Sequence, residues 1–135
     1  MPDVPPLVSI RDLRVAFHGL PALRGIDLDV GAGEAVGLVG ESGCGKSVTW
    51  LAALGLLPRT ATVTGSVTLE GREMLGAAPS VLDDVRGGRI AMIFQDPASA
   101  LNPVKRVGVQ VAEALRLHRG MVGGAAEAEV LRLFD

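Results

Sequence analysis

Eight residues from Gly40 to Ser47 combine glycines, a lysine and a serine at a spacing that suits phosphate chemistry. They fit the pattern G-x-x-x-x-G-K-[ST]. Glycines let successive backbone N–H groups turn toward one point, where they can surround a polyphosphate. Lys46 would add a positive charge for the outer phosphates, and Ser47 would offer a hydroxyl to Mg²⁺, which prefers oxygen ligands. The candidate binding residues are Gly40, Glu41, Ser42, Gly43, Cys44, Gly45, Lys46 and Ser47.

The segments on either side of this loop favour the same chemistry. Residues 35–39 are apolar or glycine, which is typical of a strand buried on both faces. Residues 47–54 are mostly apolar without glycine or proline, which predicts a helix starting at about Lys46. The first turn of such a helix points free N–H groups at the bound anion. The alternative is a glycine-rich turn with a surface lysine. Only two lysines occur among 13 basic residues, so a chance lysine here is disfavoured.

Further elements are predicted from alternation, helical spacing and breaker residues. Residues 7–17 and 26–30 are expected to pair as antiparallel strands, with Ile26, Leu28 and Val30 facing inward. A second fully apolar run, 90–94, is expected to form a central strand beside 35–39. The other predicted elements are a strand over 65–71 and helices over 79–86, 107–118 and 125–134, with Val130, Leu131 and Phe134 on one side of the last.

Composition excludes several classes of protein. The longest strongly apolar stretch, residues 48–57, is about half of what a membrane-spanning helix needs. The first six residues lack the basic and apolar regions of a signal peptide, so a cytosolic location is expected. A net charge of −2 and 3% aromatic residues argue against a nucleic-acid surface. The single cysteine excludes an internal disulfide and a cysteine metal cluster.

Taken together, these residues resemble the ATP-binding subunit of ABC transporters over nearly the whole chain. The loop 40–47 matches the family's Walker A motif, and residues 93–97, Ile-Phe-Gln-Asp-Pro, match its Q-loop. The continuation over 99–113 is similar to the branch that serves oligopeptide, dipeptide and nickel importers. The resemblance implies an α/β fold: a P-loop NTPase (ABC ATPase) core with an N-terminal antiparallel β flap and the start of a helical subdomain, truncated.

The resemblance also implies cofactors and roles for single residues. ATP and Mg²⁺ would bind at residues 40–47, with Lys46 stabilising phosphate charge and Ser47 and Gln95 near the metal. Gln95 would also position the attacking water and report the nucleotide state to the membrane subunit; the alternative is a plain polar residue at a strand end. Phe17 lies where the family places an aromatic residue that stacks on adenine, and a core phenylalanine is an equal alternative.

The resemblance further implies an organisation and partners. The expected divisions are a disordered tail over 1–6, the ATP-binding core over 7–97 and an incomplete helical subdomain over 98–135. The helical subdomain would dock on a membrane-spanning permease subunit at the inner face of the cell membrane, and a second ATP-binding subunit would complete the site. Core packing alone also explains the apolar stripes of these helices.

Several motifs of the family have no match in this sequence: the LSGGQ-type signature, the Walker B strand with its catalytic Glu, the D-loop and the switch His. Phosphoryl transfer needs an oriented water and charge stabilisation, so we expect the chain alone to bind ATP with negligible turnover. The two apolar strands lack a full sheet and would expose surface or an edge, so we also expect the isolated chain to be marginally stable and to aggregate.

Three readings follow. The first is the N-terminal part of an ATPase that couples ATP hydrolysis to peptide or nickel import. The second is a non-hydrolysing nucleotide-binding or interaction module, or an inactive gene fragment. The third, another P-loop enzyme such as a GTPase or small-molecule kinase, is disfavoured because no Asn-Lys-x-Asp motif occurs.

Overall fold

The computed structural model describes residues 4–135, except for the side chain of Pro97. Of the tail predicted to be disordered, residues 1–3 lie outside the described residues. The chain divides into two compact units, whose boundary falls between Asp83 and Asp84, and each is described by itself. The predicted division at residues 97 and 98 between a core and a helical subdomain stays a prediction.

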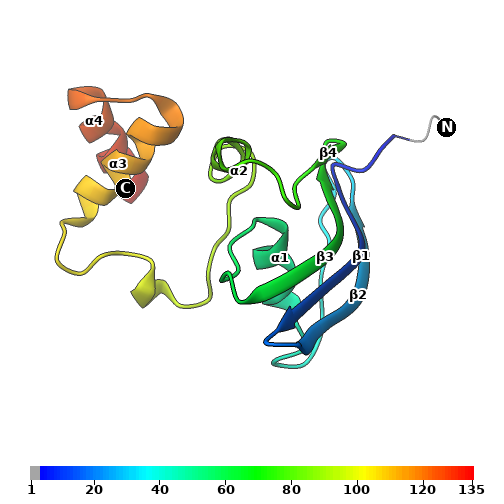
Figure 1. Ribbon diagram of the computed structural model, residues 1–135. Coiled ribbons are helices and arrows are strands. Elements are labelled where there is room, and N and C mark those ends of the chain that lie inside the picture. The colour runs from blue at the N-terminus through cyan, green and yellow to red at the C-terminus, as the bar shows by residue number, and fades with distance from the viewer. Residues whose placement is uncertain (1–3) are drawn as a thin grey trace. The chain divides into compact units, whose positions relative to one another are not determined.

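An antiparallel sheet forms the frame of the first unit (Figure 1). Its strands are β1 (Val8–Phe17), β2 (Leu20–Val30), β3 (Ala61–Leu69) and β4 (Arg72–Glu73), in the spatial order β2-β1-β3-β4. The first two strands pair antiparallel as predicted, with Val8 opposite Val30. β3 begins four residues before the predicted strand, because β1 offers it partners as far as Phe17, which lies opposite Ala61.

β1 buries its side chains at uneven intervals. Ile10, Leu13 and Val15 expose 1% or less of their surface. In a regular strand, residues 10 and 13 would point to opposite faces of the sheet. An irregularity in the β1–β2 register between Ile10 and Leu13 shifts the alternation by one residue, so both side chains reach the core.

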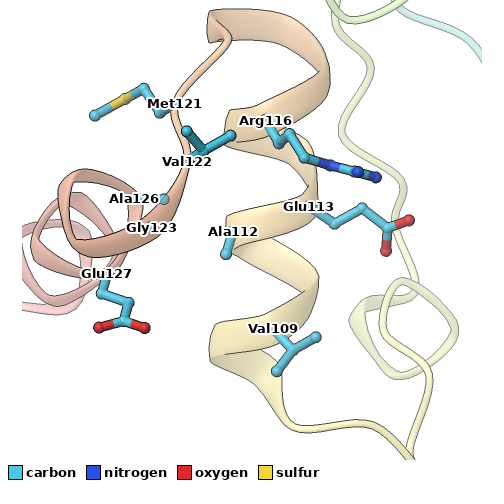
Figure 2. Close-up of a pocket in the computed structure, with 9 residues that line it drawn as sticks. All are labelled: Val109, Ala112, Glu113, Arg116, Met121, Val122, Gly123, Ala126 and Glu127. Atoms are coloured by element: carbon cyan, nitrogen blue, oxygen red, sulfur yellow. The ribbon is translucent and has the colours of Figure 1, made fainter.

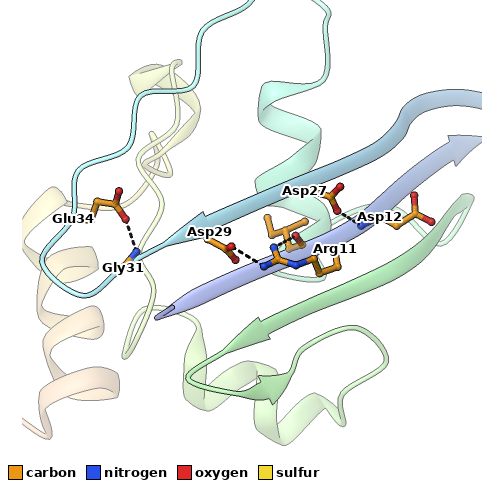
Figure 3. Close-up of polar contacts among 7 residues, drawn as sticks. Arg11, Asp12, Asp27, Asp29, Gly31 and Glu34 are labelled. Carbon is orange, nitrogen blue, oxygen red and sulfur yellow. Dashed lines mark hydrogen bonds and ion pairs between the residues drawn. The ribbon is translucent and has the colours of Figure 1, made fainter. Parts of the chain in front are cut away.

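The bulge at Asp12 is fixed by its neighbours on both sides. Asp12 has a φ of 42°, and its N–H donates to Oδ1 of Asp27 at 2.8 Å (Figure 3). Gly25 on β2 and Gly65 on β3 lie beside it. A Cβ on Gly25 would be 2.7 Å from Asp12 Oδ1, and a Cβ on Gly65 would be 2.5 Å from the Asp12 carbonyl oxygen. The obstacle at Gly65 is backbone, and φ is 102° at Gly25 and 110° at Gly65, so both positions require glycine.

Two polar contacts hold the end of β2 (Figure 3). The guanidinium of Arg11 donates to the Asp29 carboxylate at 2.6 Å and holds the pKa of Asp29 below its usual value. The backbone N–H of Gly31 donates to Oε2 of Glu34 at 2.6 Å, and the Glu34 N–H donates to the Gly31 carbonyl at 3.2 Å. The second contact closes the turn through which the chain leaves the sheet toward the glycine loop.

A helix, α1 (Lys46–Ala53), packs on the buried face of the sheet (Figure 1). It begins at Lys46, as predicted. Thr49, Ala52 and Ala53 are buried in α1, and Leu23 of β2 is buried in the sheet. The sheet thus supplies a fixed platform for the start of this helix.

The two predicted central strands are absent from the described residues. Residues 35–39 and 91–94 have no strand assignment, and only an isolated parallel bridge joins Arg86 to Ile90. Val39 is 96% exposed and Ile93 is 98% exposed. The prediction of buried strands was wrong here because a strand needs a ladder partner, and neither segment has one among the described residues.

The second unit contains a helical hairpin. The helix α2 (Pro79–Val85) crosses the boundary in sequence, a short 3₁₀ turn spans Pro97–Ser99, and α3 (Val107–Arg119) is followed by α4 (Gly123–Phe134). Leu115, Ala126 and Val130 are buried in the hairpin. Leu131 and Phe134, predicted to share the buried side with Val130, are 68% and 62% exposed. In the described part of the chain, none of the helices has the length and apolar character to cross a bilayer.

Candidate functional site: the glycine loop before α1

The ammonium group of Lys46 lies over the start of the glycine loop. Its Nζ donates to the carbonyl oxygens of Gly40 at 2.6 Å and Glu41 at 2.7 Å, and lies 3.3 Å from the sulfur of Cys44. Lys46 forms no ion pair with a carboxylate among the described residues. The positive charge is therefore held in place by neutral groups, and is not neutralised by an acid.

Two of the glycines leave no room for a side chain. A Cβ on Gly40 would lie 2.5 Å from the sulfur of Cys44. A Cβ on Gly45, which has a φ of 99°, would lie 2.4 Å from Cδ2 of Leu23. The first contact lies within the loop, and the second sets the loop against β2. Both positions favour a residue without a side chain, and such glycines are typical of loops whose N–H groups surround a phosphate.

The helix start adds donors to the same place. Gly45 caps α1 in the left-handed conformation without a side-chain hydrogen bond, so the first N–H groups of the helix are not capped by a side chain. Ser47 is exposed, and its hydroxyl has no hydrogen-bond partner among the described residues. Helix-start N–H groups and a serine hydroxyl are groups that bind phosphate oxygens and Mg²⁺ in proteins, and their role here stays a prediction.

Two residues that sequence reasoning did not select support the loop from behind. Thr49 is 2% exposed, and both its N–H and its hydroxyl donate to the carbonyl oxygen of Gly45 at 2.9 Å. Leu23 packs against Gly45, as described above. A threonine four residues after a helix-starting glycine is a usable sequence signal for such bonding. Leu23 comes from a separate strand and leaves no local signal.

The remaining predicted residues lie away from the loop in sequence. Phe17 ends β1 and is half-buried. Its stacking on adenine stays a prediction. Gln95 is exposed, makes no hydrogen bond with a described residue and belongs to the second unit. Its approach to Mg²⁺ also stays a prediction. Among the described residues, no group of three His, Cys, Asp or Glu side chains could hold a metal ion.

A separate polar cluster was also missed by sequence reasoning. The side-chain amide of Gln110 on α3 bonds to the backbone of Asn102 and Lys105, in the loop that follows Gln95. Gln110 is one polar residue on a predicted helix, so periodicity alone assigns its side chain no role.

A crevice between α3 and α4 has a volume of about 380 Å³ (Figure 2). Val109, Ala112 and Ala126 contribute apolar surface to it. The charged ends of Glu113 and Arg116 point away from α4 in Figure 2. The crevice is an apolar surface of the hairpin and holds none of the predicted nucleotide-site residues.

Comparison with known proteins agrees with the loop's chemistry. A family model described as ABC transporter matches residues 23–132. An oligopeptide transport ATP-binding protein OppD from Mycobacterium bovis is 48% identical over 135 residues, covering 96% of this chain and 22% of the relative. OppD from Salmonella typhimurium is 43% identical and covers 96% of this chain and 40% of the relative. A probable peptide ABC transporter ATP-binding protein from Sinorhizobium fredii is 47% identical, covering 93% and 38%. The chain thus spans between about a fifth and two fifths of the length of these relatives.

Proposed function

Because this chain belongs to the ABC transporter family, with the α/β P-loop fold of its ATPase domain, we propose that residues 40–47 bind MgATP within a peptide-importer ATP-binding subunit. The observation that carries the proposal is the position of Lys46. Its ammonium is held over the loop by the carbonyl groups of Gly40 and Glu41, without a carboxylate partner among the described residues. A phosphate oxygen is a stronger partner for an ammonium than a neutral carbonyl.

The roles within the site follow from chemistry and position. The N–H groups of the loop and of the first turn of α1 would bind the phosphate oxygens. Lys46 would exchange its carbonyl partners for phosphate oxygens, and the Ser47 hydroxyl would be a magnesium ligand. Thr49 and Leu23 would keep the loop in this shape when it is empty. Phe17 and Gln95 are the further candidates, for adenine and for Mg²⁺ with the attacking water.

The proposed biological role is supported by the names of the relatives. These proteins are named for oligopeptide or peptide transport and for ATP binding. We propose that the complete subunit couples ATP binding and hydrolysis to import through a membrane-spanning permease. It would lie at the cytoplasmic face of the membrane and pair with a second ATP-binding subunit. For the 135 residues themselves, the proposal is nucleotide binding.

The proposal predicts that ATP binding depends on Lys46. Purified chain would be titrated with a fluorescent ATP analogue and Mg²⁺, and affinity confirmed by competition with unlabelled ATP. Lys46→Ala removes the point charge, so we expect affinity to fall at least about tenfold.

The matched control is Lys105→Ala, since Lys105 is the chain's other lysine and is exposed. It should bind like the unchanged chain. Equal losses in both variants, or full binding by Lys46→Ala, would refute the assignment of the loop.

A further inference from the structure

We propose that Gln110 is a positioning residue for Gln95: it ties the loop after Gln95 to α3, so that Gln95 and the helix form one rigid body. The functional half of this inference rests on the proposed role of Gln95 at the MgATP site. The structural half concerns only the second unit and stands independently.

All the hydrogen-bonding groups of the Gln110 amide are used. Its Oε1 accepts the N–H of Asn102 at 2.8 Å. Its Nε2 donates to the carbonyl of Asn102 at 3.0 Å and to the carbonyl of Lys105 at 3.0 Å. A primary amide has two donors and one acceptor group, and here each has a backbone partner. The side chain therefore bonds to the approach to α3 at three points.

The loop is also tied to itself on the way back to Gln95. The N–H of Val104 donates to Oδ1 of Asn102 at 3.0 Å, which closes the turn before α3. Nearer to Gln95, the N–H of Ala98 donates to Oδ1 of Asp96 at 3.0 Å, and the Ser99 hydroxyl donates to the Asp96 carbonyl at 3.1 Å. The last two contacts join Ala98 and Ser99 of the short 3₁₀ turn, Pro97–Ser99, to the residue before the turn. Local bonds thus extend from Asp96 to within three residues of the Gln110 clamp.

Gln95 itself depends on this framework for its position. Its side chain is exposed and makes no hydrogen bond with a described residue. Its location is therefore set by the backbone next to it, beginning at Asp96. Because Gln110 attaches the far end of the same loop to α3, the clamp opposes those displacements of Gln95 that the loop transmits.

Glutamine is the residue type that this clamp requires. Glutamate would keep the acceptor for Asn102 but would place negative oxygen against two carbonyl groups. Lysine would keep donors for the carbonyls but lose the acceptor, and leucine would lose all three bonds. The series Gln110→Lys, Gln110→Glu and Gln110→Leu is therefore graded in the number of contacts that survive.

The first test measures order along the loop by ¹⁵N relaxation of the 135-residue chain without nucleotide. We expect rigid-backbone order parameters, about 0.8, at Gln95, Ala98 and Val104. In Gln110→Leu these should fall below about 0.6, including at Gln95. The control Glu113→Gln alters an exposed residue one turn along α3 and should change none of them. Far-UV circular dichroism would show that each variant keeps its helices.

Two results would overturn the clamp. A loss of order confined to residues 102–105 would show that the tie does not reach Gln95. Low order at Gln95 in the unchanged chain would show that no rigid body exists. Because this test uses no ATP, it decides the structural half even if the loop 40–47 bound no nucleotide.

The second test separates positioning from general loosening. ATP affinity would be measured with Mg²⁺ and with EDTA. The ratio of the affinity in Mg²⁺ to the affinity in EDTA would then be compared between variants. If Gln110 acts through Gln95, Gln110→Leu and Gln95→Ala should each lower the ratio several-fold, and the double variant should lose no more than either alone. Affinity in EDTA should be unchanged.

Equal weakening with and without Mg²⁺, or additive losses in the double variant, would contradict the positioning role. Absence of Lys46-dependent binding in the unchanged chain would instead refute the proposed function, and the relaxation result would then decide the clamp alone. The two failures are therefore distinguishable.

Discussion

At Gly40 the space that a side chain would occupy is filled by the sulfur of Cys44. A methyl carbon there would lie 2.5 Å from the sulfur, whereas the next atoms, Lys46 Nζ and Cys44 Cβ, are 3.6 and 3.8 Å away. Gly40 does not have a positive φ, so the sulfur is the main obstacle. The requirement for glycine is therefore a contact between two named residues.

This contact predicts a reversible defect. Gly40→Ala should weaken MgATP binding by about 1–3 kcal/mol, the usual cost of forcing an extra methyl group into occupied space. Adding Cys44→Ala removes the sulfur and should restore most of the affinity, which a titration of the single and double variants would measure. Gly43→Ala is the comparison: nothing lies within 4 Å of its Cβ, but its φ is 80°, so Cys44→Ala should not rescue it. If the double variant bound MgATP as weakly as Gly40→Ala alone, the sulfur of Cys44 would not be the obstacle at Gly40.

At this scale the sequence predicts which residues form the candidate site, and the structure shows Lys46 in contact with Gly40. The spacing of Gly40, Lys46 and Ser47 is local, and a loop of fixed length brings such residues together by itself. Leu23 was out of reach because its contact with Gly45 depends on how β2 crosses behind the loop. The hydrogen bonds of Gln110 could not be predicted from the sequence, because its partners are backbone groups, which every residue type carries.

Among the elements, the β3–β4 hairpin contains a carboxylate with several donors. Oε1 of Glu73 accepts the N–H groups of Val67, Met74 and Leu75 at 2.9–3.1 Å, and Oε2 accepts the Ser66 hydroxyl at 2.5 Å. Burial acts to raise the pKa of Glu73, but these hydrogen bonds outweigh it, and the net pKa is lowered. The ionised form thus holds the hairpin together.

The shift predicts how stability depends on pH. Because the folded pKa is lowered, the stabilisation is present above the ordinary carboxyl pKa, about 4.3, and is lost as pH falls below it through the folded value. Glu73→Gln should lower the free energy of unfolding by about 1 kcal/mol at pH 7, a modest amount because the group is largely exposed. The difference in unfolding free energy between the two proteins should shrink at low pH. Urea unfolding of both proteins across this range would measure it.

Glu113→Gln provides the control, because this carboxylate on α3 is exposed and forms no hydrogen bond or ion pair with a described residue. Its unfolding curve should follow that of the unchanged chain at each pH. If the difference in unfolding free energy between Glu73→Gln and the unchanged chain stayed constant down to the lowest pH measured, ionised Glu73 would not be the stabilising group.

Element types followed from the sequence where each element is stabilised locally. The helices over 79–86, 107–118 and 125–134 were predicted within two residues at each end, because helical bonds form within one segment. The strands predicted at 35–39 and 90–94 are absent from the described residues, because the hydrogen bonds of a strand need a second segment as partner. The bulge in β1 was also missed, since only the pairing with β2 and β3 reveals it.

On the scale of the molecule, the exposed apolar segments are the main departure from an ordinary surface. Val39 and Ile93 are almost completely exposed, and each lies in an apolar extended segment without a ladder partner among the described residues. Extended apolar segments with free backbone groups are sites of self-association. We expect the 135-residue chain to associate as its concentration rises.

This expectation can be tested with charged replacements. Val39→Lys and Ile93→Lys should reduce the concentration-dependent increase in sedimentation coefficient without lowering the unfolding midpoint, since neither side chain is packed. Val104→Lys is the control: this side chain is 88% exposed but lies in a turn, so its replacement should leave association unchanged. If all three variants associated like the unchanged chain, other surfaces would be responsible.

The bulge at Asp12 has a consequence for the speed of folding. A hairpin such as β1–β2 can zip up in several alignments, and each wrong alignment is a kinetic trap that must reopen before folding continues. At Asp12 only a residue without a side chain fits opposite on β2, where Gly25 stands, and likewise on β3, where Gly65 stands. An alignment slipped by one residue would bring Arg24 or Ile26 against Asp12 and would turn Leu13 outward. The bulge therefore destabilises slipped alignments, and the pairing of β1 with β2, and then with β3, is limited to one register.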